Sequence, residues 1–235
     1  MTPELLQAVS ASAAAIGLAG TSAYFSPWLW RQSRMGGIRQ QLANRRMLAL
    51  TYDDGPSSVL TPQLLDLLQR RGARATFFML GRHAKQHSEI ADRILRDGHA
   101  VGCHSYDHLN AWKSAPWDAV ADIRSGYDQL APWLSSDGMF RPPHGKMTLP
   151  TYWDIRRRGA SVWWWTIDSG DTHDRLPSVG HAADQLRRES GGIVLMHDLD
   201  RGKQRNDFVL ELTNVLLDVA MEERLKVVTL SEICQ

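Results

Sequence analysis

Residues 47–56 read Met-Leu-Ala-Leu-Thr-Tyr-Asp-Asp-Gly-Pro, an apolar run that passes directly into two carboxylates and a turn. Large apolar residues in such a short run favour a buried strand, and Gly55 with Pro56 favours the turn that ends it. An Asp-Gly turn does not require a second carboxylate beside the first, where like charges repel. The pattern therefore marks Asp53 and Asp54, at the end of a strand, as candidate functional residues.

Six further segments have a similar apolar composition and are also predicted to be strands: Ala75–Leu80, Ala100–Cys103, Met139–Arg141, Ser161–Ile167, Ile193–Met196 and Lys226–Leu230. Helix-patterned stretches separate most of them, and the first such helix has Pro62 in its opening turn and Gly72 after its end. Strands that alternate with helices in this way fit a parallel barrel better than an open sheet. We predict one α/β domain over residues 46–235, a distorted parallel (β/α) barrel of about seven strands.

Polar side chains lie at or just past the C-terminal ends of five predicted strands. They are Asp53 and Asp54, His104 and His108, Arg141 and His144, Asp168 and Asp171, and His197 and Asp198. In a parallel barrel these strand ends converge on one mouth, where active sites are built. The sequence therefore predicts a single site to which all five segments contribute.

The segment His104-Ser-Tyr-Asp-His108 carries two imidazoles four residues apart, a spacing that brings both to one side of a turn. Together with Asp54 they offer two nitrogen ligands and one oxygen ligand. That set suits zinc with an open position for water, with cobalt and nickel as alternatives. A cation at Asp54 offsets the repulsion between the two carboxylates and leaves Asp53 free to act as a base. Histidines at this spacing also occur on solvated surfaces, so the prediction depends on the carboxylates.

The composition is that of an ordinary globular protein, with 235 residues, 43% hydrophobic and 23% charged. The 27 basic and 26 acidic residues give a formal net charge of +1, which provides no general field to attract nucleic acid. The two cysteines form neither a metal-type pair nor a disulfide framework. We interpret Cys103 as a buried core residue beside His104, and we expect no nucleic-acid partner.

The N-terminal region, residues 1–45, differs from the rest of the chain. From Leu5 to Trp30 it contains no acidic or basic residue, and this length is enough to span a bilayer. Several arginines follow as a basic linker, a distribution that places the later residues in the cytoplasm. We predict membrane attachment through residues 5–30 with a cytoplasmic catalytic domain. The alternatives are an extracytoplasmic domain, or an alanine-rich helix that lies on the domain or on the membrane surface.

Five short motifs occur in the order found in the polysaccharide deacetylases of the NodB homology family, carbohydrate esterase family 4. The resemblance runs from about Leu48 to the C-terminus and implies a NodB-like barrel. The segments that carry it are Leu50-Thr-Tyr-Asp-Asp-Gly-Pro56, His104-Ser-Tyr-Asp-His108, Phe140-Arg-Pro-Pro-His-Gly145, Trp165-Thr-Ile-Asp-Ser-Gly-Asp-Thr172 and Val194-Leu-Met-His-Asp198. A single motif of this kind arises by chance, but five in order do not.

The resemblance implies a role for residues in each motif. In the first two motifs, the catalytic base is Asp53, and the metal ligands are Asp54, His104 and His108. In the fifth motif, Leu195 lines a small pocket for the acyl methyl group and His197 is the general acid. These assignments agree with the reading of the carboxylate pair and the histidines from their chemistry.

The third and fourth motifs carry the remaining roles and depart from the family at two positions. The resemblance implies that Arg141 orients the base, that the backbone N–H of His144 helps to hold the oxyanion, and that Asp171 pairs with the catalytic histidine. The family usually has Tyr in place of His144 and Trp in place of Thr172. The first change leaves the backbone role intact. The second removes an indole from one wall of the substrate groove, unless Trp163 or Trp164 replaces it.

The implied activity is metal-dependent hydrolysis of an N-acyl group, acetyl above all, from an amino sugar in a polysaccharide, an oligosaccharide or a lipid-linked glycan. Two other classes stay open: a sugar-binding module without turnover, and a metal hydrolase that cleaves an O-acetyl ester or a phosphoester. A pure binding module has no need of both a base and an acid. A phosphoesterase usually places more cationic groups around its metal.

Overall fold

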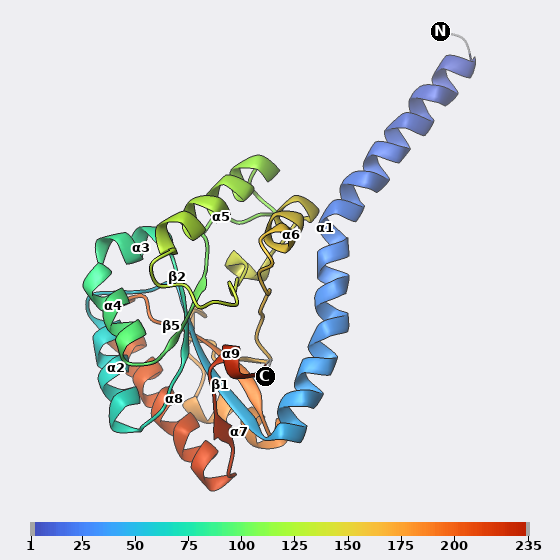
Figure 1. The fold of residues 1–235 in the computed structure, drawn as a ribbon. Helices are drawn as coiled ribbons and strands as arrows, with labels where there is room; N and C mark the ends of the chain where they lie inside the picture. The colour runs from blue at the N-terminus through green and yellow to red at the C-terminus, as the bar shows by residue number, and fades with distance from the viewer. Residues whose placement is uncertain (1–2, 234–235) are drawn as a thin grey trace.

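A computed structural model describes the backbone of residues 3–233 and the side chains from residue 22 onward, except those of residues 23 and 25 and of 234–235 (Figure 1). The helices and strands follow one another as α1 (Pro3–Arg45), β1 (Met47–Asp53), α2 (Leu60–Arg70), β2 (Thr76–Met79), α3 (Gly81–Gln86), α4 (Ser88–Arg96), β3 (Ala100–Cys103), α5 (Pro116–Leu130), the 3-10 turn η1 (Pro143–Gly145), α6 (Leu149–Arg157), β4 (Ile167–Asp168), α7 (Val179–Glu189), β5 (Gly192–His197), α8 (Lys203–Glu222), β6 (Lys226–Val227) and α9 (Leu230–Ile233).

The strands form one parallel sheet in the order β3-β2-β1-β5-β4, and β6 pairs with the beginning of β1. β1 is central, and every residue from Met47 to Asp53 is buried, as expected for a parallel strand covered on both faces. The register brings Asp53 opposite Phe78 of β2 and opposite His197 of β5. The C-terminal ends of neighbouring strands therefore lie side by side, which confirms the predicted α/β architecture.

Isolated bridges connect the two edges of this sheet. Cys103 at the end of β3 bridges to Phe140, and Phe140 bridges to Val162, whose segment leads into β4. The predicted strands at residues 139–141 and 161–167 are therefore present only as single bridges and the two-residue β4. The barrel is distorted, because irregular segments take the place of two of its strands. A few hydrogen bonds hold these segments together, such as the one from the Phe140 N–H to the Ser161 carbonyl at 2.8 Å.

The helices pack on the sheet through apolar stripes. In α2 the buried side chains include Leu60, Leu64, Leu65 and Leu68, at the spacing of one helical face. Gly72 follows the end of this helix with φ of 59°, the left-handed conformation that glycine adopts at low cost. These features agree with the predicted helix and its end.

Cys103 is fully buried, and burial raises the pKa of its thiol to about 12.

Helix α1 extends along one side of the domain, and its N-terminal half projects beyond it in Figure 1. Its second half packs on the barrel, because Met35 and Leu42 are buried in the core and Arg45 donates a hydrogen bond to the Ile233 carbonyl at 2.9 Å. The predicted boundary after residue 45 falls at the end of this helix. Within the part of the chain whose side chains are described, no helix is long and apolar enough to cross a membrane. Most of the predicted anchor, residues 5–21, lies outside that part.

Candidate active site

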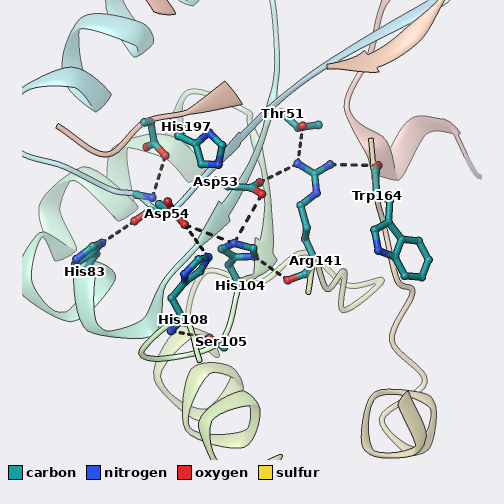
Figure 2. Close-up of polar contacts among 12 residues, drawn as sticks. Thr51, Asp53, Asp54, His83, His104, Ser105, His108, Arg141, Trp164 and His197 are labelled. Atoms are coloured by element: carbon teal, nitrogen blue, oxygen red, sulfur yellow. Dashed lines mark hydrogen bonds and ion pairs between the residues drawn. The ribbon is translucent and has the colours of Figure 1, made fainter. Parts of the chain in front are cut away.

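The end of β1 fixes the first carboxylate of the site through a buried arginine. Arg141 is fully buried, and its Nη1 donates to Asp53 Oδ1 at 2.8 Å and to Thr51 Oγ1 at 2.7 Å (Figure 2). The guanidinium also lies 4.2 Å from the centroid of the Phe78 ring. Two hydrogen bonds and an aromatic contact hold this cation in one orientation, so it fixes the position of the Asp53 carboxylate and provides its counter-charge.

Asp54 points the other way, and the side chains of Arg201 and His83 contact it. Its φ of 74° is unusual for a residue with a side chain. Arg201 Nη2 contacts Asp54 Oδ2 at 3.0 Å, and the Asp54 carbonyl lies 2.6 Å from His83 Nδ1. The other oxygen, Oδ1, is buried without a hydrogen-bond partner and lies 3.5 Å from His104 Nε2 and 3.3 Å from His108 Nε2.

The unpartnered oxygen and the two imidazole nitrogens form a cluster whose ligand atoms all lie within 4.8 Å of one another. His104 Nδ1 lies 2.7 Å from the Arg141 carbonyl, so this nitrogen carries the proton and Nε2 offers its lone pair to the cluster. Burial and the neighbouring His104 lower the pKa of His108, which keeps this imidazole neutral. One carboxylate oxygen without a partner and two imidazole nitrogens that face it fit a divalent cation, as predicted for Asp54, His104 and His108.

His197 at the end of β5 has the geometry of a proton donor. Its Nδ1 lies 2.9 Å from Asp171 Oδ1, and its backbone N–H donates to Asp171 Oδ2 at 2.8 Å. Burial alone would lower the pKa of His197, but the hydrogen bond and the negative charge of Asp171 raise it to about 9. The imidazole is therefore charged at neutral pH, with Nε2 left to donate.

Because the pKa of His197 is raised, the charged form persists up to about pH 9 and is lost above it. We expect activity that depends on this proton to fall on the alkaline side. In Asp171→Asn the stabilising charge is gone, so the alkaline limb of the kcat/KM profile should move at least one unit toward lower pH. A pH–rate profile of both proteins measures this shift, and an unchanged alkaline limb would remove His197 as the donor.

Asp53, His197 and the cluster of Asp54, His104 and His108 face one cavity of about 350 Å³. Thirteen residues from several strand ends line it: Asp53, Asp54, His104, His108, Pro142, His144, Gly145, Trp165, Asp168, Thr172, Leu195, His197 and Arg201. The structure thus places the predicted site residues together, with Arg141 and Asp171 directly behind Asp53 and His197. Trp163 and Trp164 are buried, and the indole on the wall of this cavity is Trp165.

Several residues that shape the site were not predicted as part of it. Arg201 contacts the carboxylate of Asp54, His83 its carbonyl, and Thr51 the guanidinium of Arg141. No motif contains Arg201 or His83, so only the fold reveals them; Thr51 stood within the first motif. Of the two further acids at strand ends, Asp198 is buried and accepts hydrogen bonds from the Gly55 N–H and Thr61 Oγ1, whereas Asp168 is exposed at the cavity wall.

Comparison with known proteins agrees with this arrangement. The sequence model of the family described as polysaccharide deacetylase matches residues 40–163. A peptidoglycan-N-acetylglucosamine deacetylase of Bacillus cereus is 32% identical over 194 residues, which cover 81% of this chain and 89% of the relative. The chain belongs to the polysaccharide deacetylase family. It is accordingly a hydrolase of carbon–nitrogen bonds other than peptide bonds.

Two further similarities extend over most of the chain. A chitin deacetylase of Colletotrichum lindemuthianum is 31% identical over 242 residues, which cover 94% of this chain and 92% of the relative. The crystal structure of a peptidoglycan N-acetylglucosamine deacetylase in complex with 4-naphthalen-1-yl-N-oxidanyl-benzamide superposes with a TM-score of 0.73 at 25% identity, covering 81% of this chain and 89% of that one. The predicted family and NodB-like fold are confirmed.

Proposed function

We propose that the protein is a metal-dependent deacetylase that removes the N-acetyl group from an amino-sugar unit of a glycan. One observation carries the proposal. Asp53, with Arg141 behind it, and His197, with Asp171 behind it, occupy paired positions at the ends of β1 and β5, beside the Asp-His-His cluster. Hydrolysis of an amide needs a base for water and an acid for the leaving amine, and this pairing supplies both.

Asp54, His104 and His108 would hold the metal, and zinc is our assignment because two imidazoles and one carboxylate suit it better than magnesium or calcium. Cobalt and nickel are the alternatives. A zinc ion in such a site polarises an acyl carbonyl and lowers the pKa of water. The contact of Arg201 with Asp54 Oδ2 favours coordination through Oδ1 alone.

Two residues of the chain then carry out the two proton transfers, Asp53 as the base and His197 as the acid. Asp53, oriented by Arg141, takes a proton from the attacking water. The backbone N–H of His144 donates to the oxyanion that develops at the acyl carbon. His197 gives its proton to the nitrogen of the leaving amine, and Asp171 stabilises the charged imidazole before that step. Leu195, which is almost fully buried and lines the cavity, would contact the acyl methyl group.

The competing readings are less consistent with this set of residues. A binding module would not require the base and acid pairs, each with its own buried partner. Phosphoester hydrolysis would require cations free to bind phosphate oxygens, whereas Arg141 is committed to Asp53 and Arg201 contacts Asp54. Cleavage of an O-acetyl ester uses the same machinery and is our second candidate, because an ester oxygen is a better leaving group than an amine.

The test is acetate release by the purified chain across a panel of N-acetylated substrates: chitin oligomers, peptidoglycan fragments, an exopolysaccharide and a lipid-linked amino sugar. Formate release from N-formyl analogues and acetate release from O-acetylated xylan serve as comparisons, and elemental analysis identifies the metal. We expect acetate from at least one N-acetylated member, and loss of activity with a chelator. No release from any member, or release from the ester alone, would overturn the proposal.

The placement of the chain in the cell remains a prediction from the sequence alone. The charge-free residues 5–30 and the arginines behind them favour membrane attachment with a cytoplasmic catalytic domain. On that side of the membrane a precursor or a lipid-linked glycan is the accessible substrate. Protease digestion of intact spheroplasts measures the placement, and degradation of the domain from outside would reverse it.

A further inference from the structure

Helix α1 reaches the wall of the active site through one side chain. Arg31 is half-buried between α1 and the segment that leads into β4, and its Cζ lies 5.1 Å from the centroid of the Trp165 ring and 5.7 Å from that of Trp164. Both distances are within the range of a cation–π contact. Among the described residues Arg31 makes no ion pair. Its guanidinium contacts both indoles, and the indole of Trp165 lines the catalytic cavity.

The same side chain also approaches the turn that carries His144. A Cβ atom added to Gly145 would lie 3.0 Å from Trp165 Cη2 and 3.4 Å from Arg31 Nη1, and Gly145 has a φ of 66°. A larger residue here would be strained by this backbone conformation and would crowd both side chains. Arg31, Trp165 and the turn at 144–145 therefore pack as one unit on the cavity wall.

Further contacts hold α1 along this segment. Trp30 packs edge-to-face on Trp164 with ring centroids 5.4 Å apart, and Arg39 Nη2 donates to the Thr166 carbonyl at 3.2 Å. Three consecutive residues, 164–166, thus each contact α1. Arg31 and Trp30 lie outside residues 40–163 that match the family. This part of the wall is supported by chain that precedes the matched region.

We propose that α1 is part of the active site: Arg31 positions the indole of Trp165, which forms the stacking surface for a sugar ring of the substrate on the side where Thr172 offers no aromatic ring. The inference rests on the proposed function for the identity of the ligand. Thr172 and Trp165 line the same cavity, and a threonine side chain has no flat apolar face. A pyranose ring packs its C–H face on an indole, so Trp165 would bind the sugar and Arg31 would act through it as a positioning residue.

The test measures equilibrium binding of N-acetylglucosamine pentamer by calorimetry, with zinc present, in the Asp53→Asn background, where turnover does not interfere. We expect Trp165→Ala to raise Kd about 10-fold and Arg31→Met to raise it roughly 3-fold, with Arg31→Lys between parent and Arg31→Met. The matched control is Arg34→Met on the same helix, whose guanidinium lies over Trp30 and does not reach Trp165; it should bind as the parent does.

A double substitution separates positioning from a direct or general effect. If Arg31 acts through the indole, Arg31→Met should have no further effect in the Trp165→Ala background. An equal effect of Arg31→Met in both backgrounds, or parental Kd values for both single variants, would overturn the inference. Trp165→Phe replaces Trp165→Ala if the latter fails to fold, and it should give an intermediate Kd. Acetate release by the parent chain reports on the proposed function separately, because binding is measured without turnover.

Discussion

Asp53→Asn should lower turnover on an N-acetylated oligosaccharide by about 10²–10⁴-fold while the protein still binds its metal. The amide cannot accept a proton from water at neutral pH, and general-base catalysis contributes this range in rate. Asparagine keeps an oxygen for Arg141 Nη1, which also retains its hydrogen bond to Thr51 Oγ1. Kinetics of acetate release, together with elemental analysis of both proteins, measure the two expectations.

Structural damage has to be distinguished from loss of the base in this variant. The buried guanidinium loses its counter-charge, so we expect a melting temperature a few degrees below that of the parent. Asp118→Asn on the exposed start of α5 is the matched control and should leave turnover and metal content unchanged. Near-parental turnover in Asp53→Asn would mean that another group accepts the proton. If His197→Ala were also fully active, the assignment of Asp53 as the base and His197 as the acid would have to be abandoned.

The sequence predicts the positions of the main strands well, because parallel strands that are buried on both faces consist of short runs of apolar residues. Every residue of β1 is buried, and β2, β3 and β5 begin within one residue of the predicted positions. The segments at 139–141 and 161–167 are less regular than predicted. Their apolar residues are also buried. The two segments lie between β3 and β4, where single bridges replace a continuous ladder of hydrogen bonds. Burial alone does not distinguish a regular strand from an extended segment.

In the site, the sequence reveals the functional residues that are neighbours in the chain, but it does not reveal those that only the fold brings together. Asp53 with Asp54, and His104 with His108, are adjacent in the chain, so their chemistry is visible in the motifs. Arg201 contacts Asp54 from the loop after β5, and Arg31 contacts Trp165 from the helix before β1. Nothing in their local sequence marks either residue. Only the tertiary packing places a guanidinium against Asp54 or Trp165. Residues that position other residues are therefore the ones that sequence patterns miss.

His104→Ala should lose the metal and the activity together, which distinguishes it from substitution of the base. Its Nε2 is one of three ligand atoms within 4.8 Å of one another, and alanine leaves only Asp54 and His108. We expect metal affinity to fall more than ~100-fold, since even substitution of groups behind metal ligands costs 10–100-fold. Turnover should fall by roughly 10³ or more, because several kcal/mol of transition-state stabilisation go with the ion.

Competition with a chromogenic chelator measures the affinity, and acetate release at increasing zinc concentration measures the activity. His181→Ala at the exposed start of α7 removes an imidazole far from the cluster and should match the parent in both assays. Because His104 Nδ1 also contacts the Arg141 carbonyl, the substitution removes a hydrogen bond beside the base, and added zinc should restore at most part of the rate. Parental zinc affinity in His104→Ala would show that the cluster of Asp54, His104 and His108 is not the metal site, whatever the effect on turnover.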